Sequence, residues 1–322
     1  MSVTTHSPRT AGAHSPLRSR PAVRALLEGP ALTPADLSMV LLVTEDQVAR
    51  PMPTVTVNDI PAVVRECAAL GIRSVKVFAE SSKRDATGEL SVDPGSLMAR
   101  AIRAVKDTEP AIAVMTETCL CSYTDNGHCY ITDHHARPNL AATIDVTSRQ
   151  AVAHAEAGAD IVGPASMVLG TTRGARDALD QSGHGAVSVM PHVIFWSSLY
   201  DGFRRTMGAS PKAGVNREFQ INPTRPDQFI DTAMRMVADG ADMLLLEPGL
   251  FTGDMLRDLK DRTLAPLFPF SVSGEYTTLA PLDPGTGERD VRTLVEYCTT
   301  LRRAGAAATV TYGAVEIARQ LS

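Results

Sequence analysis

Eight short runs of β-type residues, separated by longer helical segments, constrain the fold of this 322-residue chain more than any other feature. The runs begin at Ser38, Ser74, Ala111, Asp160, Val187, Asp242, Leu267 and Ala308. Each run is apolar almost throughout, which is typical of strands buried on both faces of a parallel sheet. Eight such units in about 280 residues predict a closed (β/α)8 TIM barrel, an α/β fold. The alternative is an open doubly wound sheet, but the first run is not followed by the glycine-rich phosphate turn of that fold.

The N-terminal segment has a different composition from the rest of the chain. It reads MSVTTHSPRTAGAHSPLRSRP, which is basic, rich in Ser, Pro and His, and without the apolar stretch of a secretory signal. We therefore expect residues 1–36 to form an N-terminal arm and residues 37–322 to form one barrel domain. The arm predicts a homo-oligomer, from dimer to octamer.

Charge and hydropathy narrow the range of partners. The formal net charge is −5, whereas a nucleic-acid-binding protein would present a basic face. No apolar stretch approaches the roughly 20 residues that are needed to span a bilayer. We expect a cytoplasmic protein with neither nucleic acid nor membrane as a partner.

Three cysteines lie close together in the segment ETCLCSYTDNGHC: Cys119, Cys121 and Cys129. Zinc prefers thiolate ligands, and three protein ligands leave a fourth position for water or substrate. Thiols stay reduced in a cytosolic chain, where clustered cysteines usually bind metals. The spacing therefore predicts a Zn²⁺ site. The alternatives are a disulfide with a spare thiol, or loop cysteines without a ligand.

The barrel prediction also says where to look for the chemistry, because active sites of this fold lie at the carboxyl ends of the strands. The polar residues at those ends are Glu45, Glu80, Glu117, Ser166, His192, Glu247, Ser273, Glu275 and Tyr312. The loop after the fifth run contains the cationic residues Arg204, Arg205, Lys212, Arg217 and Arg225. Such a loop is expected to close over a carboxylate substrate, and an ordinary solvated loop is the alternative.

Taken together, these segments resemble the porphobilinogen synthase family, also called δ-aminolevulinic acid dehydratase. CLCSYTDNGHC is similar to its zinc loop, and GADIVGPASM, YDGFR, GADMLLLEPGL, VSGEY and TYG follow in the family's order. The resemblance implies a (β/α)8 barrel, arm-mediated dimers that usually build octamers, and condensation of two amino-keto acids into a pyrrole. It also implies a zinc held by Cys119, Cys121 and Cys129. The substrate-binding residues that it implies are Tyr200, Phe203, Arg204, Gln220, Ser273 and Tyr312.

The chain departs from the family at the two lysines that form Schiff bases. Where the family reads MVKPG, this chain reads LLEPG, so Glu247 occupies one lysine position. The other falls on Ile194, and no lysine lies between Lys106 and Lys212. The lid also has Asn216 where the family usually has an arginine. Because a Schiff base needs a nucleophilic amine, ordinary porphobilinogen synthesis is not expected.

The remaining residues predict a different chemistry. Zinc can polarise a carbonyl without an amine, and Glu247 could then act as general base, with Ser273 and Tyr312 completing the catalytic set. The alternative for Glu247 is a structural carboxylate paired with an arginine. Lys76 lies inside the second run and is either a relocated catalytic amine or a member of an ion pair with Glu80 or Glu247.

We therefore expect a porphobilinogen synthase-like, zinc-dependent lyase. It would condense, dehydrate or cleave a small amino- or keto-carboxylic acid. Two alternatives stay open. One is a genuine δ-aminolevulinic acid dehydratase with unusual catalytic residues, and the other is an inactive paralogue that binds ligand.

Overall fold

The computed structural model describes residues 16–210 and 218–322, and the chain divides into two compact units between Ala31 and Leu32. The described part of the first unit contains two short helices, α1 (Pro16–Ser19) and α2 (Pro21–Leu26). Proline opens each of them, as suits the first turn of a helix, where the missing N–H costs nothing. The predicted role of this segment as an oligomerisation arm stays a prediction.

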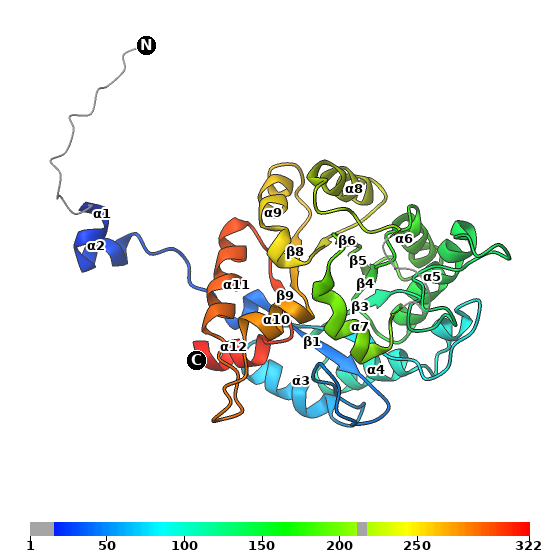
Figure 1. The fold of residues 1–322 in the computed structure, drawn as a ribbon, viewed down its shortest axis with the longest axis horizontal. Coiled ribbons are helices and arrows are strands. Elements are labelled where there is room, and N and C mark those ends of the chain that lie inside the picture. The colour runs from blue at the N-terminus through cyan, green and yellow to red at the C-terminus, as the bar shows by residue number, and fades with distance from the viewer. Residues whose placement is uncertain (1–15, 211–217) are drawn as a thin grey trace, which may run out of the picture. The chain divides into compact units, whose positions relative to one another are not determined.

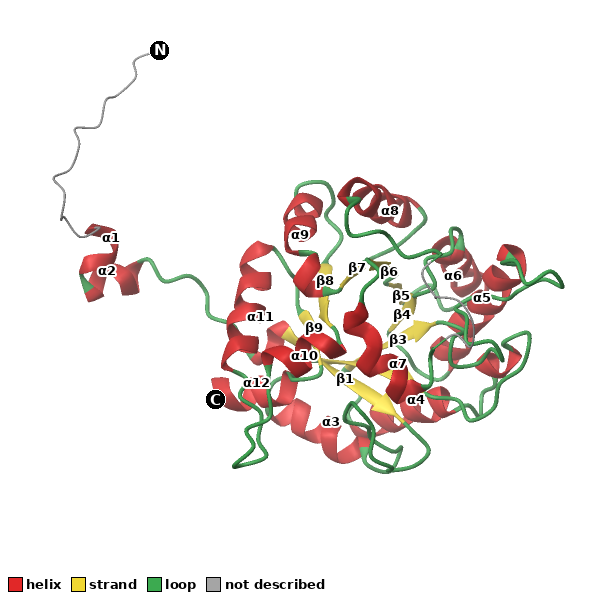
Figure 2. Ribbon diagram, viewed as in Figure 1, coloured by secondary structure: helices red, strands yellow, loops and turns green. Residues whose placement is uncertain are grey.

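The centre of the second unit is a nine-stranded parallel sheet, shown as arrows in Figure 1 and in yellow in Figure 2. Its strands are β1 (Leu37–Val43), β2 (Ser74–Ala79), β3 (Ala113–Thr118), β4 (Ile161–Pro164), β5 (Ser188–Val189), β6 (His192–Ile194), β7 (Leu244–Glu247), β8 (Leu267–Ser271) and β9 (Thr309–Thr311). They are ordered β5-β4-β3-β2-β1-β9-β8-β7-β6. The strand residues are almost all buried, as expected of a parallel sheet covered by helices.

Strands β5 and β6 are two halves of the fifth predicted run. They are separated by Met190 and Pro191, and proline has no N–H with which to continue the ladder. β5 pairs with β4 and β6 pairs with β7, so one continuous segment joins the two ends of the sheet. The sheet therefore curls into a ring, and the prediction of a TIM-barrel-like α/β fold is confirmed.

Helices surround the ring of strands (Figure 2). They are α3 (Ile60–Ala69), α4 (Leu97–Thr108), α5 (Leu140–Glu156), α6 (Thr171–Gln181), α7 (Asp201–Met207), α8 (Pro226–Ala238), α9 (Gly253–Lys260), α10 (Ser273–Leu279), α11 (Arg292–Ala304) and α12 (Ala314–Leu321). Short 3₁₀ helices lie in the connections. They are η1 (Pro34–Asp36), η2 (Glu89–Val92), η3 (Ser198–Tyr200) and η4 (Gly249–Phe251). None of the helices in the described ranges is long and apolar enough to cross a bilayer.

Candidate active site

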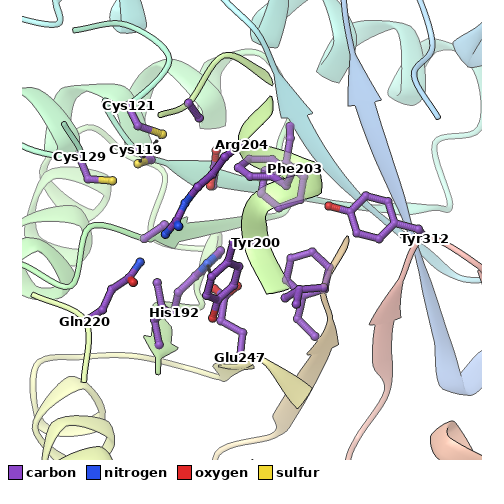
Figure 3. A pocket seen from close by; sticks show the side chains of 17 residues that line it. Cys119, Cys121, Cys129, His192, Tyr200, Phe203, Arg204, Gln220, Glu247 and Tyr312 are labelled. Carbon is purple, nitrogen blue, oxygen red and sulfur yellow. Dashed lines mark hydrogen bonds and ion pairs between the residues drawn. The ribbon is translucent and has the colours of Figure 1, made fainter. Parts of the chain in front are cut away.

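A cavity opens at the carboxyl ends of the strands, as the barrel fold predicts (Figure 3). Its wall contains three thiols, several aromatic rings, one arginine and two carboxyl groups. The lining residues are Phe78, Glu117, Cys119, Cys121, Cys129, Ala165, His192, Ile194, Tyr200, Phe203, Arg204, Ala209, Gln220, Glu247, Phe270, Val272 and Tyr312. Among these lining residues there is no lysine.

The three predicted metal ligands meet at one side of the cavity. Cys119 and Cys121 follow directly after β3, and the loop returns to bring Cys129 beside them, with all three Sγ atoms within 4.8 Å of one another. The Sγ atoms of Cys119 and Cys121 are 3.4 Å apart. Thiolates at about 2.3 Å from one zinc lie about 4 Å apart. Cys119 and Cys121 already have a separation suited to a shared metal, and Cys129 lies close enough to serve as the third ligand.

Electrostatics also favour a thiolate in this cluster. Hydrogen bonds from the Cys119 and Cys129 thiols hold the pKa of Cys121 well below its usual value, and the charge of Arg84 acts in the same direction. The Arg84 Nη1 atom donates to the Cys121 carbonyl oxygen at 2.8 Å, which braces the loop. A deprotonated thiol is the form that binds metal. Sequence reasoning missed Arg84, because only the fold brings its loop to the cysteines.

Glu117 adds a carboxyl group beside the thiols. Burial raises its pKa well above the usual value, and the charge of Cys121 acts in the same direction. It occupies the second-to-last position of β3, two residues before Cys119.

Two further lining residues, His192 and Glu247, belong to a hydrogen-bonded row of three buried side chains. The Lys76 Nζ atom lies 3.0 Å from Nε2 of His192, and Nδ1 of that histidine lies 2.8 Å from Oε1 of Glu247. Lys76 also donates to the carbonyl oxygen of Thr116 at 2.7 Å. The three side chains come from β2, β6 and β7, so only the closure of the barrel brings them together.

Burial is the largest cause of the pKa shifts of these three side chains. It raises the pKa of Glu247 to about 8, against the positive charges of Lys76 and Arg204, which act to lower it. It lowers the pKa of Lys76 to about 8, against the carboxyl groups of Glu117 and Glu247. It also holds the pKa of His192 well below its usual value, so this imidazole is neutral at physiological pH. Shifts of this kind are typical of active sites.

The predicted substrate-binding residues converge on the same cavity. Arg204 of α7 lies over the ring of Tyr200, with 5.3 Å from the guanidinium carbon to the ring centroid, and its nearest carboxylate, Asp201, is 3.8 Å away. Phe203 packs edge-on against Phe78, and Gln220 faces the cavity from the other side of Arg204 in Figure 3. The arginine is therefore held by stacking while its charge stays available to a ligand.

Tyr312 and Ser273 have different surroundings. The Tyr312 hydroxyl is buried at the cavity and has no hydrogen-bond partner among the described residues. Ser273 is not one of the residues that line the cavity. Its Oγ atom accepts a hydrogen bond from the Phe203 N–H at 3.0 Å and donates to the Leu199 carbonyl oxygen at 2.8 Å. It thus braces the segment that carries Arg204, and its predicted contact with substrate stays a prediction.

Some polar strand ends lie away from the cavity. Glu80 pairs with Arg50, Glu45 pairs with Arg100, and Glu275 accepts hydrogen bonds from Tyr297 and from backbone N–H groups. Ser166 is buried but does not line the cavity. Arg225 pairs with Asp227 on the surface, Arg205 is exposed, and Lys212, Asn216 and Arg217 lie outside the described residues.

Comparison with known proteins gives a consistent relationship along almost the whole chain. A sequence model of the delta-aminolevulinic acid dehydratase family matches residues 13–320. The delta-aminolevulinic acid dehydratase of Escherichia coli strain K12 is 34% identical over 314 residues, covering 94% of this chain and 96% of that protein. The Halalkalibacterium halodurans enzyme of the same name is 32% identical over 319 residues, covering 96% of each chain.

A solved structure shows the same fold. The crystal structure of delta-aminolevulinic acid dehydratase (porphobilinogen synthase) from Toxoplasma gondii, in complex with the product porphobilinogen, superposes with a TM-score of 0.89 at 28% identity. The match covers 96% of this chain and 91% of that one.

Proposed function

Since this chain belongs to the delta-aminolevulinic acid dehydratase family, we propose that it is a zinc-dependent lyase with altered chemistry. It acts on a small amino- or keto-carboxylic acid and makes or breaks a C–C or C–O bond without a Schiff base. Ordinary porphobilinogen synthesis is not its reaction. We also propose that it is a homo-oligomer, from dimer to octamer, built through residues 1–36.

One observation supports the altered chemistry above the others. Glu247, which the resemblance to the family aligns with a lysine position, lines the cavity and is almost fully buried, and His192 Nδ1 lies 2.8 Å from one of its oxygens. A carboxylate cannot form an imine, but one whose pKa is raised to about 8 by burial suits proton transfer near neutral pH. Glu247 therefore replaces covalent activation with general-base catalysis.

The other residues bind and orient the substrate. Arg204 and Gln220 hold its carboxylate, since Arg204 supplies the positive charge among the described residues that line the cavity. Tyr312 offers a hydroxyl without another partner in the described part of the chain. Ser273 completes the set through its contact with the segment that carries Arg204. A zinc ion held by Cys119, Cys121 and Cys129 would supply a Lewis acid that polarises a carbonyl or hydroxyl oxygen.

Proton abstraction can be tested with levulinate, a small keto-carboxylate. Zinc-loaded protein is incubated with levulinate in D₂O, and deuterium uptake beside the ketone is followed by ¹H NMR. We expect exchange by the wild-type protein and a loss of about 10²- to 10⁴-fold in Glu247→Gln, the usual contribution of a general base. Glu80→Gln is the matched control, because Glu80 directly follows another strand of the sheet, β2, but pairs with Arg50 away from the cavity. Equal exchange in Glu247→Gln and wild type, or none in either, would contradict the proposal.

A second experiment separates this proposal from an ordinary dehydratase. The protein is incubated with 5-aminolevulinate, tested for a pyrrole with an aldehyde reagent, and reduced with borohydride before mass spectrometry. We expect neither a pyrrole nor a lysine adduct. Rapid pyrrole formation together with a trapped lysine would show a genuine dehydratase with an unusual amine.

A further inference from the structure

A buried amine, an imidazole and a carboxyl group lie in one row beneath the cavity. We infer that Lys76 is a positioning residue, which acts through His192 by fixing the histidine proton on Nδ1 and so orienting the Glu247 carboxylate. The effect of this row on turnover rests on the proposed function, whereas the proton position does not.

When Lys76 is charged, only one placement of the hydrogen atoms satisfies every hydrogen bond between Lys76, His192 and Glu247. An ammonium group has hydrogens to donate and no lone pair to accept with. Its nitrogen lies 2.7 Å from the Thr116 carbonyl oxygen and 3.0 Å from His192 Nε2, so Nε2 must be the unprotonated nitrogen. The single proton of the neutral ring is then on Nδ1, from which it is donated to Glu247 at 2.8 Å.

Gly163 of β4 makes room for this arrangement. A Cβ atom at Gly163 would lie 3.0 Å from His192 Nε2, 3.0 Å from the Thr116 carbonyl oxygen and 2.8 Å from the Met190 carbonyl oxygen. The first two of these atoms are the acceptors of Lys76. A side chain at position 163 would therefore crowd the imidazole and both carbonyl groups, and the row could not keep its present geometry.

The position of Lys76 favours this indirect role over that of a relocated nucleophile. Lys76 is fully buried and does not line the cavity, whereas His192 and Glu247 do. The amine therefore has no open path to a substrate carbonyl. Its charge instead compensates that of Glu247 from the far side of the imidazole.

Several other ionisable groups act on Glu247 from neighbouring elements. The Arg204 guanidinium of α7, like the Lys76 ammonium, lowers the pKa of Glu247. The remaining groups that interact with its charge are Glu117 of β3, Tyr200 of η3, Glu275 of α10 and Tyr312 after β9. Removal of Lys76 takes away one of the two cations that lower this pKa among the described residues, and it should make Glu247 harder to ionise.

Solid-state ¹⁵N NMR of protein labelled at the histidine rings tests the proton position without any substrate. His192→Gln identifies the His192 signals among the eight histidines. In the wild type we expect Nδ1 protonated and Nε2 bare. In Lys76→Met, we expect the Nε2 signal to shift. We also expect the midpoint of the Glu247 titration, followed through its effect on the Nδ1 signal, to rise by about one pH unit, which is a tenfold change in the proton affinity of Glu247.

Two further variants keep the test decisive. Lys83→Met is the matched control, because Lys83 is exposed, and it should leave the His192 signals unchanged. If Lys76→Met fails to fold, Gly163→Ala displaces the ring while keeping both charged groups, and it should shift Nε2 in the same way. A wild-type proton on Nε2, or His192 signals unchanged in the folded Lys76→Met or Gly163→Ala protein, would overturn the inference. Loss of Glu247-dependent exchange alone would instead count against the proposed function.

Discussion

The two sides of the cavity are built in different ways. The thiol side comes from one loop, in which Cys119, Cys121 and Cys129 lie within a short stretch after β3. The carboxyl side comes from Lys76, His192 and Glu247 on three separate strands. The first cluster is encoded by local spacing, whereas the second exists only once the barrel has closed. The two clusters have no member in common, but the charge of Glu117 interacts with Cys121 on one side and with Lys76 and Glu247 on the other. Substitution of a thiol should therefore act first on metal binding and reach the carboxyl side through Glu117.

The largest expected effect is loss of metal from the thiol side. Cys121→Ala removes the thiol that is most readily ionised, and zinc content should fall from about one ion per chain to near zero, as measured by mass spectrometry of metals. Cys67→Ala should retain its zinc, because Cys67 is a buried residue of α3. Zinc retained in Cys121→Ala, or wild-type protein purified without metal under reducing conditions, would contradict the metal site. The His192 NMR signals should shift less in Cys121→Ala than in Lys76→Met, because Cys121 acts on the row through the charge of Glu117 whereas Lys76 contacts His192 directly.

The thiol side could be predicted from the sequence and the carboxyl side could not, because the first depends on local spacing and the second on closure of the barrel. Barrel architecture and the cysteine cluster follow from local periodicity and spacing, and the structure bears out the fold and brings the three thiols together. The eight predicted runs become nine strands because the fifth is divided at Met190 and Pro191. The partner of Lys76 could not be found in this way. A two-residue period places Lys76 on the same strand face as Glu80, yet Glu80 pairs with Arg50 and Lys76 meets His192 from across the barrel.

The need for glycine at position 163 also could not be predicted from the local sequence. In the sequence GADIVGPASM it is one small residue inside an apolar run, without a positive φ or a turn to explain it. Its reason lies in β3 and β6, whose Thr116 and His192 atoms occupy the space of a side chain. Only pairing of β4 with both neighbouring segments reveals this constraint.

The carboxyl side should control the pH dependence of catalysis. A general base must be deprotonated, so deuterium exchange into levulinate should rise with pH and level off above the Glu247 pKa of about 8. From pH 6 to pH 7 the rate should increase by about tenfold, since each unit below the pKa lowers the ionised fraction by that factor. Exchange rates measured in D₂O buffers across this range, with the solvent isotope shift applied, provide the test. A profile that is flat from pH 6 to pH 9 would exclude Glu247 as the titrating base.

A smaller effect is expected on stability when the carboxyl side is crowded. Gly163→Ala places a methyl group 2.8 Å from the Met190 carbonyl oxygen, and overpacking of this kind costs about 1–3 kcal/mol of unfolding free energy. Urea denaturation measures this cost. Gly253→Ala is the matched control, because nothing lies within 4 Å of the added atom and its φ is not in the left-handed range. Equal midpoints for the two variants would show that β4 can move away and that the contact is loose.

The smallest expected effect distinguishes the hydroxyl of Tyr312, which we expect to bind a ligand, from that of Tyr276, which stabilises the fold. Tyr312 and Tyr276 are neighbouring buried tyrosines, but Tyr276 donates to Glu316 at 2.9 Å, whereas the Tyr312 hydroxyl has no partner in the described ranges. Tyr276→Phe should therefore lose about 1 kcal/mol of unfolding free energy and leave levulinate binding unchanged. Tyr312→Phe should leave stability unchanged and weaken levulinate binding about fivefold, which corresponds to about 1 kcal/mol for one hydrogen bond. Urea denaturation and isothermal titration with levulinate measure the two quantities separately. If Tyr312→Phe changed stability but not binding, its hydroxyl would belong to the wall of the barrel and the carboxylate would be held on the Arg204 side alone.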